Sequence, residues 1–162
     1  MENLTLILKR LLEKQLDFVL VGGYAAVLHG ASQVTHDIDI CAVITQGELI
    51  KLRHALGDLN PKHRMNPNFS PSLLEYPSEN QVIDNFYLST DAGVLDILKE
   101  MKPIGSFERI KANAISVKIF GLDCKVICIE DLITIKQSMN RPKDKIVLSE
   151  LLAVKSRLDS QK

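Results

Sequence analysis

The sequence predicts one α+β domain, with a mixed central sheet and flanking helices, over residues 1–162. Apolar residues recur at helical spacing near both ends of the chain, and short apolar runs bounded by turn residues indicate buried strands between them. A hairpin pattern comes late, and no strict strand–helix–strand repeat is present, which favours α+β over a parallel α/β sheet. We expect the core over about 15–100, followed by the hairpin and helices over about 101–162.

Helices are predicted where apolar residues follow a period of 3.6 residues. In the first of them, Leu4, Ile7, Leu8 and Leu11 share one face. Asn140-Arg141-Pro142 separates the last two, because proline cannot continue a helix. The predicted helices cover residues 3–15, 24–28, 47–56, 130–139 and 143–158.

Strands are predicted where the runs are β-branched and apolar. The last two of these runs flank Gly121-Leu122-Asp123 and are expected to form a hairpin. Residues 57–80 contain four prolines with many Asn and Ser residues, so a long loop with at most a short edge element is expected. The predicted strands cover residues 17–21, 37–44, 82–89, 93–98, 115–120 and 124–129.

The composition is that of a soluble globular protein, with 46% hydrophobic and 25% charged residues. No apolar run approaches the roughly 20 residues that span a bilayer, and the N-terminus lacks the basic region of a secretory signal. Cys41, Cys124 and Cys128 each sit among apolar neighbours. We therefore expect a cytoplasmic protein with reduced thiols and no membrane partner.

The charges are distributed unevenly along the chain. The net charge is zero, which excludes a global field that attracts nucleic acid. Residues 1–98 nevertheless carry a net charge of −5, and residues 99–162 one of +5. Either an acidic half binds cations beside a basic half that meets phosphates, or the solvated faces simply differ.

Two aspartates interrupt an otherwise apolar strand. Asp37 and Asp39 are two residues apart, so they share one face while Ile38 and Ile40 share the other. Two like charges at this separation repel each other unless a cation lies between them, and Mg²⁺ and Mn²⁺ prefer oxygen ligands. The pair therefore indicates a metal site, with an exposed strand start as the alternative.

Two further features lie at a distance in the sequence. Gly22-Gly23 follows a buried strand and precedes a helix, where backbone N–H groups could bind phosphate, although a plain tight turn has the same pattern. Asp96 is a lone carboxylate in Val94-Leu95-Asp96-Ile97-Leu98. If its strand lies beside that of Asp37, the three carboxylates could hold two metal ions and also accept a proton.

Gly22-Gly23, Asp37-Ile38-Asp39 and Leu95-Asp96-Ile97 together resemble the signature of the DNA polymerase β-like nucleotidyltransferase superfamily. The local sequence is closer still to small bacterial members, namely the minimal nucleotidyltransferases and the nucleotidyltransferase toxins of AbiEii type. Their C-terminal pattern, a helix lysine followed by Arg-Pro-Lys-Asp, matches Lys136 and residues 141–144. The resemblance covers about residues 15–155.

The resemblance implies a role for each matching residue. Asp37, Asp39 and Asp96 would be the catalytic residues and would bind Mg²⁺ or Mn²⁺, and Asp96 would also help to deprotonate the acceptor. A second group would contact the nucleotide: Gly22, Gly23, Thr35 and Lys136. For Lys136 a solvated position on its helix is an equal alternative, and Asp144 is expected to cap the last helix or to pair with a basic residue.

Two positions depart from the relatives. Many of them have arginine where this chain has Gln33, and commonly a basic residue where it has His36. With Gln33 in place of arginine, the chain lacks a fixed cation near the triphosphate. This leaves open weaker nucleotide binding and a weakened or inactive enzyme. His29 and His36 near Asp37 could suggest zinc, but their spacing is irregular, and His29-Gly30 is more simply the end of a helix.

The predicted activity is transfer of a nucleoside monophosphate from an NTP such as ATP to an acceptor hydroxyl, with release of pyrophosphate. The acceptor could be an RNA end, a protein or a small antibiotic, and a toxin-like role would add an antitoxin partner. The alternative is a nucleotide-binding or partner-binding module that keeps the fold with weakened catalysis, which Gln33 favours.

Overall fold

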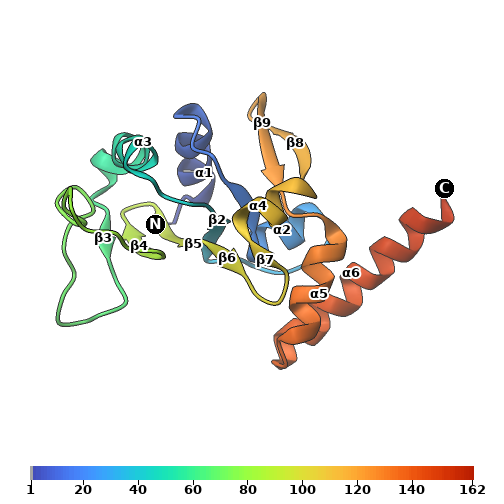
Figure 1. The fold of residues 1–162 in the computed structure, drawn as a ribbon. Coiled ribbons are helices and arrows are strands. Elements are labelled where there is room, and N and C mark those ends of the chain that lie inside the picture. Colours follow the sequence, from blue (N-terminus) through green and yellow to red (C-terminus); the bar gives the residue numbers. More distant parts are fainter. Residues whose placement is uncertain (1) are drawn as a thin grey trace.

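The computed structural model describes residues 2–162 and confirms an α+β fold built on a mixed seven-stranded sheet (Figure 1). The order across the sheet is β3-β4-β5-β2-β1-β9-β8. Pairs β2–β5 and β1–β9 are parallel, and the other neighbours are antiparallel. The strands are β1 (Val19–Val21), β2 (Asp37–Cys41), β3 (Lys62–His63), β4 (Phe86–Thr90), β5 (Gly93–Leu98), β8 (Ile115–Ile119) and β9 (Leu122–Val126). A small ribbon adds β6 (Glu100–Met101) and β7 (Gly105–Ser106).

Three of the helices begin at a residue whose side chain caps them, and the helices cover the sheet in two groups. The side chains of Asn3, Thr45 and Ser106 accept hydrogen bonds from the first turn of their helices. Helices α1 and α3 contact each other on one side of the sheet, and α5 and α6 pack together at the other end (Figure 1). The helices are α1 (Leu4–Glu13), α2 (Gly22–Leu28), α3 (Gln46–Leu56), α4 (Phe107–Ala112), α5 (Ile129–Ser138) and α6 (Pro142–Ser160), with a 3₁₀ turn η1 (Gly57–Leu59) after α3.

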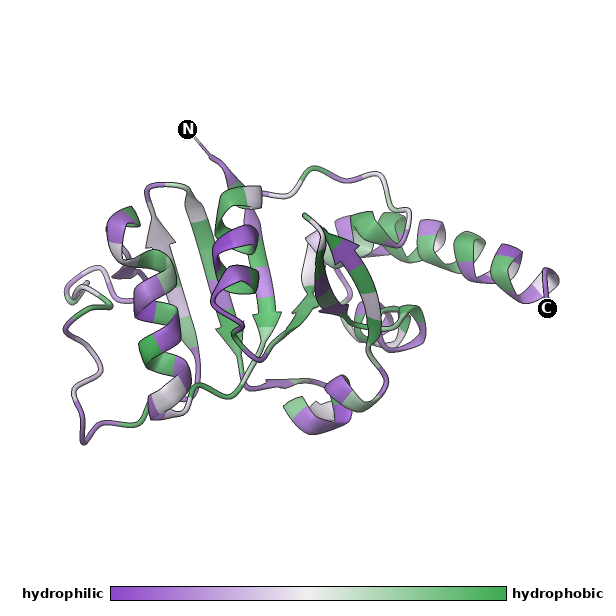
Figure 2. Ribbon diagram, turned by 90° about the horizontal axis from the view of Figure 1, so that it is seen from above, coloured by the Kyte–Doolittle hydropathy of each residue, from purple (hydrophilic) through white to green (hydrophobic). Residues whose placement is uncertain are grey.

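The core lies between the sheet and α1. The apolar face of α1 is fully buried at Ile7, Leu8 and Leu11, as its helical period predicts, and α1 contacts β2, β5 and β9. The short strand β1 is buried on both faces. Figure 2 shows this distribution, with apolar colour along the central strands and mixed colour on the helices around them. This core leaves the opposite face of β2 and β5 available for polar side chains.

Several predicted boundaries were wrong for identifiable reasons. The strand predicted over 82–89 begins only at Phe86, which pairs with Ile97, the residue before the end of β5. The residues before Asn85 therefore lie beyond the end of β5. The hairpin turn lies at Phe120-Gly121, both with positive φ, so β9 starts at Leu122, earlier than predicted. Helix α4 and the β6–β7 ribbon were missed because they are too short to show a period.

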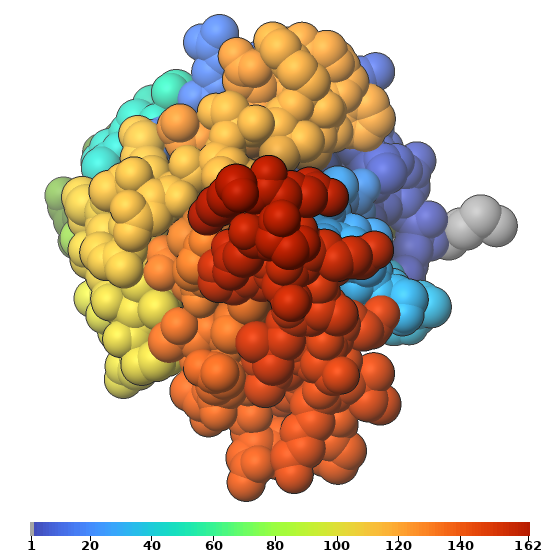
Figure 3. Space-filling model, turned by 90° about the vertical axis from the view of Figure 1, so that its right-hand side faces the viewer, coloured from blue at the N-terminus to red at the C-terminus, as the bar shows by residue number. Residues whose placement is uncertain are grey.

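Helix α6 is the longest element and lies against α5 at one end of the molecule. Figure 3 shows that end, where the C-terminal part of α6 lies at the centre of the view and the β8–β9 hairpin lies above it. The C-terminal turns of α6 extend away from the sheet (Figure 1). Within residues 2–162, no helix combines the length and the apolarity needed to cross a membrane.

Candidate active site

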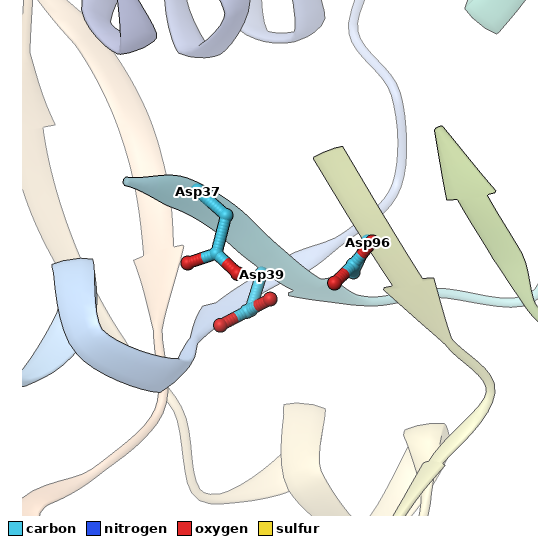
Figure 4. A group of neighbouring side chains, drawn as sticks. All are labelled: Asp37, Asp39 and Asp96. Atoms are coloured by element: carbon cyan, nitrogen blue, oxygen red, sulfur yellow. The ribbon is translucent and has the colours of Figure 1, made fainter. Parts of the chain in front are cut away.

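Three aspartates from two adjacent parallel strands converge on one face of the sheet. Asp37 and Asp39 alternate along β2 with Ile38 and Ile40, which are fully buried against the core. In β5, Asp96 lies directly opposite Asp39. Each of the three offers a carboxylate oxygen, and these oxygens lie within 4.8 Å of one another. Figure 4 shows all three side chains on the same side of their strands.

The donor set of this cluster fits a hard divalent cation. All three groups are carboxylates, and Mg²⁺ and Mn²⁺ are bound by oxygen ligands in this way. The separation of the oxygens is short enough for one ion to contact more than one of them. The side chains are half-buried, so solvent and substrate can still reach the site. Asp37, Asp39 and Asp96 are therefore the residues that could hold a metal.

The field within the cluster opposes ionisation of its central member. Burial raises the pKa of Asp39 to about 7, and the charges of Asp37 and Asp96 add to the rise. Lys136 and Arg64 act in the opposite direction. Burial also raises the pKa of Asp96, although its hydrogen bond with Arg64 lowers it in part. A divalent cation would relieve this repulsion, which is the electrostatic property expected of a metal site.

Gly22 has two reasons to be glycine. It follows β1, where Val21 pairs with Asp39, so its backbone lies against that aspartate. Its φ of +68° belongs to the left-handed region. A Cβ added to it would lie 2.8 Å from the Cβ of Asp39. The glycine thus lets the start of α2 approach the carboxylates.

Gly23 marks the second contact of α2 with the site. A Cβ there would lie 2.6 Å from Nε2 of Gln33 and 2.8 Å from Cγ2 of Thr35. Gln33 therefore packs directly on the glycine backbone, in the position where the resemblance led us to expect arginine. The segment before β2 thus presents a neutral amide to Gly23.

Helices α5 and α6 are joined by a buried ion cluster at the edge of the site. The Nζ of Lys136 donates to Asp144 at 3.2 Å, and the Nε of Arg141 donates to the same carboxylate at 2.6 Å. Lys136 is only 9% exposed and Asp144 only 1%. The hydrogen bonds from Arg141 and Lys136 lower the pKa of Asp144. Pairing of Asp144 with basic residues is thus observed, and Lys136 is not the freely solvated lysine of the alternative.

Arg64 was not identified from the sequence. Its Nη2 donates to both carboxylate oxygens of Asp96, each at 2.7 Å. Its backbone N–H donates to the carbonyl of Tyr87, the residue that pairs with Asp96 across β4 and β5. No sequence pattern marks Arg64, because it lies in the Pro- and Asn-rich stretch after β3, and its partner is 32 residues away.

All of these groups line one cavity of about 550 Å³, a volume typical of small-molecule sites. The residues predicted from the sequence meet there: Gly22, Gly23, Thr35, Asp37, Asp39, Asp96 and Lys136. The structure adds Arg64, Tyr87, Arg141 and Lys143. Basic side chains therefore lie on two sides of the carboxylate cluster, a charge pattern that suits a polyphosphate bound through a cation.

The histidines and cysteines do not contribute to this cluster. His29 is the residue that ends α2, as predicted. Its Nε2 donates to the carbonyl of Ile127 at 2.7 Å. His36 lines the cavity, but its ring is exposed and lies 3.4 Å from Glu2. All three cysteines lie in the described part of the chain as buried free thiols.

No protein-family model matches this chain, and no curated protein is significantly similar to it in sequence. Solved structures do match. The lincosamide antibiotic adenylyltransferase LnuA, solved with lincomycin, is 17% identical with a TM-score of 0.60, over 91% of this chain and 93% of that one. A putative nucleotidyltransferase from Thermotoga maritima is 16% identical with a TM-score of 0.52, over 91% and 88%.

The protein has a nucleotidyltransferase fold. The same fold is found in ANT(2'')-Ia, solved in complex with adenylyl-2''-tobramycin, at 12% identity and a TM-score of 0.52, over 96% and 94% of the two chains. The predicted superfamily resemblance is thereby confirmed at the level of the fold. The narrower resemblance to AbiEii-type toxins stays a prediction.

Proposed function

We propose that the protein transfers a nucleoside monophosphate from an NTP to an acceptor hydroxyl. The observation that carries this proposal is the convergence of Asp37, Asp39 and Asp96 on one cavity wall, in a fold shared with nucleotidyltransferases. The acceptor oxygen forms a bond to the α-phosphorus, and the bond from that phosphorus to the bridging oxygen of the β-phosphate breaks. Pyrophosphate leaves, and the proton of the acceptor hydroxyl passes to a carboxylate.

The residues divide this work by position. Gly22 and Gly23 bring backbone close to the carboxylates, and Lys136, Arg141 and Lys143 supply positive charge on the same wall of the cavity. We place the triphosphate along this wall, because phosphate groups bind best where fixed cations and backbone N–H groups are already oriented. Thr35 packs on Gly23 and would help to hold the glycine backbone in place.

The acceptor would approach from the opposite side. Asp96 pairs with Tyr87 and contacts Arg64, on the strand farther from the glycines, and would take the acceptor proton. To do so its oxygens must be released by Arg64, which holds both of them in this structure. A divalent cation on Asp37, Asp39 and Asp96 would supply stabilisation of the negative charge that develops on the phosphate.

The direct test uses each of the four NTPs labelled at the α-phosphate, with Mg²⁺ or Mn²⁺, against total RNA and a cell lysate. Label in RNA, in protein or in small molecules would identify the acceptor class. The double variant Asp37→Asn/Asp39→Asn is the control and should transfer nothing. The proposal is wrong if the unmutated protein labels no acceptor with any NTP and any acceptor fraction.

Gln33 supports a second candidate, a nucleotide-binding module with weakened catalysis. Its neutral amide packs on Gly23, where a guanidinium would add a fixed charge for phosphate. Thermal shifts separate the two functions. A metal-dependent thermal shift with NTP, without labelling of any acceptor, would favour the nucleotide-binding module. In that case Gln33→Arg should raise the affinity for nucleotide.

A further inference from the structure

A second cavity of about 210 Å³ adjoins the active site on the acceptor side. Its walls come from the segment after β3 and from β4, and Tyr87 lines both this cavity and the larger one. Tyr87 pairs with Asp96 across the antiparallel strands β4 and β5, so the two side chains lie on the same face of the sheet. Their strands are about 4.8 Å apart. Tyr87 is the one described residue that lines both cavities, so a ligand packed on its ring would lie beside the strand that carries the proposed proton acceptor.

The second cavity is walled by aromatic rings in a fixed arrangement. Tyr76 packs edge-on against both His63 and Phe69, with ring centroids 5.1 and 5.4 Å apart. His63 is held further by a hydrogen bond from its Nε2 to the carbonyl of Tyr76 at 2.9 Å. Phe69 nevertheless remains 53% exposed. An exposed aromatic ring on a preorganised support is a surface on which a ligand ring can stack.

Two asparagines at this cavity offer hydrogen-bond donors. The Oδ1 of Asn66 accepts from the backbone N–H of Asn68, and the Oδ1 of Asn85 accepts from that of Lys99. Within residues 2–162 the Nδ2 groups of these two asparagines have no protein acceptor. The Arg64 guanidinium lies over the Tyr87 ring, 6.0 Å from its centroid. No carboxylate among the described residues lines this cavity. Such a lining suits hydroxyl and carbonyl oxygens and offers an ammonium group no carboxylate partner.

We propose that this cavity, bounded by His63, Phe69, Tyr76 and Tyr87, binds the acceptor of the transfer, and that the acceptor is a small uncharged ring-bearing alcohol. This inference rests on the proposed function. The cavity volume of about 210 Å³ limits the acceptor to a small molecule. Residues 61–90 hold two basic and three acidic residues, so this segment offers no row of basic side chains for a nucleic-acid backbone. A polycationic acceptor would find no carboxylate partner among the described residues that line this cavity.

The test measures binding of two probes to the full chain by saturation-transfer NMR. Phenyl β-D-glucoside represents an uncharged ring with hydroxyl groups, and tobramycin represents a polycation. The glucoside should receive saturation and tobramycin should not. Phe69→Ala should weaken glucoside binding about tenfold, the effect of losing one stacking ring. Phe120→Ala, which removes a ring of similar exposure (50%) on the β8–β9 hairpin, should leave it unchanged.

A paramagnetic arm tests whether the probe lies beside the carboxylates. Mn²⁺ should broaden the bound glucoside signals in the unmutated protein, and Asp37→Asn/Asp39→Asn should abolish the broadening without abolishing binding. The inference is overturned if the glucoside does not bind, if Phe69→Ala has no effect, or if Mn²⁺ binds without broadening the probe. Displacement of the glucoside by a five-nucleotide RNA but not by its monomers would overturn it in favour of an RNA end.

The two proposals can fail separately. If Mn²⁺ does not bind to the protein while the glucoside binds and depends on Phe69, the metal-dependent transfer is wrong and the cavity still selects uncharged rings. If Mn²⁺ and NTP bind but the glucoside does not, the transfer stands and the proposed acceptor class is wrong.

Discussion

At the scale of single residues, the chemistry of this site depends on charges that are unfavourable without a ligand. Asp39 is the clearest case, because burial and two neighbouring carboxylates raise its pKa to about 7. Arg64 is the counterpart, a cation that compensates Asp96 from a loop. Each residue leads to a prediction that can be measured without any knowledge of the acceptor.

We predict that Asp39→Asn stabilises the metal-free protein at neutral pH. The folded-state pKa of Asp39 lies above its ordinary value, so the folded state holds the proton more tightly, and the free energy of unfolding falls as pH rises from about 4 to about 7. The variant lacks this loss and should be more stable by roughly 1–4 kcal/mol at pH 8. Urea unfolding with EDTA at pH 4 and pH 8 measures it, and an equal difference at both pH values would contradict the assignment.

We predict that Arg64→Ala raises the affinity for Mn²⁺ in the absence of nucleotide. Arg64 donates twice to Asp96, so it competes with a cation for the same oxygens. Its removal should tighten binding severalfold, on the order of 1 kcal/mol. Electron paramagnetic resonance titration gives the affinity directly. Arg10→Ala, which removes a similar two-point pair with Asp58 in another part of the molecule, should change nothing, and unchanged affinity in Arg64→Ala would show that Arg64 does not compete.

At the scale of elements, the site depends on how closely α2 approaches β2 and how firmly α5 is held to α6. Close approach is set by Gly22, the first residue of α2. The attachment of α5 to α6 is set by Asp144, buried between Lys136 and Arg141. Gly22 and Asp144 are single residues, and each sets the position of a whole helix relative to the site.

We predict that Gly22→Ala is more destabilising than Gly121→Ala. Both glycines have positive φ, 68° and 74°, so both variants incur backbone strain of about 1 kcal/mol. Only at Gly22 does the new Cβ meet Asp39, whereas Gly121 has open space. An additional loss of roughly 1–3 kcal/mol is expected from that overpacking, together with weaker Mn²⁺ binding. Equal unfolding midpoints for the two variants would argue against a steric role for Gly22.

We predict that Asp144→Ala destabilises the protein by about 3–5 kcal/mol, because it leaves Lys136 buried without its partner. Asp58→Ala is the matched control. It breaks an exposed pair with Arg10, so it should cost far less than the loss of Asp144. Denaturant unfolding at pH 7 compares them. Since the pKa of Asp144 is lowered in the folded state, its contribution should also disappear as pH falls through that lowered value. Similar costs for the two variants would mean that the cluster is not a structural link.

At the scale of the whole molecule, the two halves of the chain share one sheet. Strand β9 lies beside β1, and β8 follows it, so the sheet is completed by residues after 100. The cavity likewise combines residues before 100 with Lys136, Arg141 and Lys143. The acidic and basic halves of the sequence therefore meet at the site. This favours the interpretation that the acidic half binds a cation beside a basic half that meets phosphates.

We predict that residues 1–162 unfold as one cooperative unit. Because β1 lies between β2 and β9, no boundary divides the sheet into two separate cores. Far-ultraviolet circular dichroism follows the helices, and tyrosine absorbance follows Tyr24 in α2, Tyr76 in the loop after β3 and Tyr87 in β4. The two signals should give the same midpoint. Two separate midpoints would indicate that the C-terminal helices fold independently of the sheet.

Local patterns in the sequence were enough for the fold class and the carboxylates. Asp37, Asp39 and Asp96 could be found because a charge inside an apolar strand is rare enough to stand out. The elements with a clear period were found at nearly their full length, among them α1, α3 and α6. The β6–β7 ribbon and α4 were missed because so few residues carry no periodic signal, and the start of β4 was misplaced because it depends on where β5 ends.

What the sequence determined by itself was the set of groups able to bind a cation, since alternation along a strand places Asp37 and Asp39 on one face regardless of context. What only the tertiary structure decided was which groups surround them. Asp96 lies opposite Asp39, Arg64 hydrogen-bonds Asp96, and an aromatic cavity adjoins the site at Tyr87. These contacts join residues 32 or more positions apart or arise in a loop, where direction is set by packing and hydrogen bonds. No local pattern encodes them, because their energies exist only once the sheet has formed.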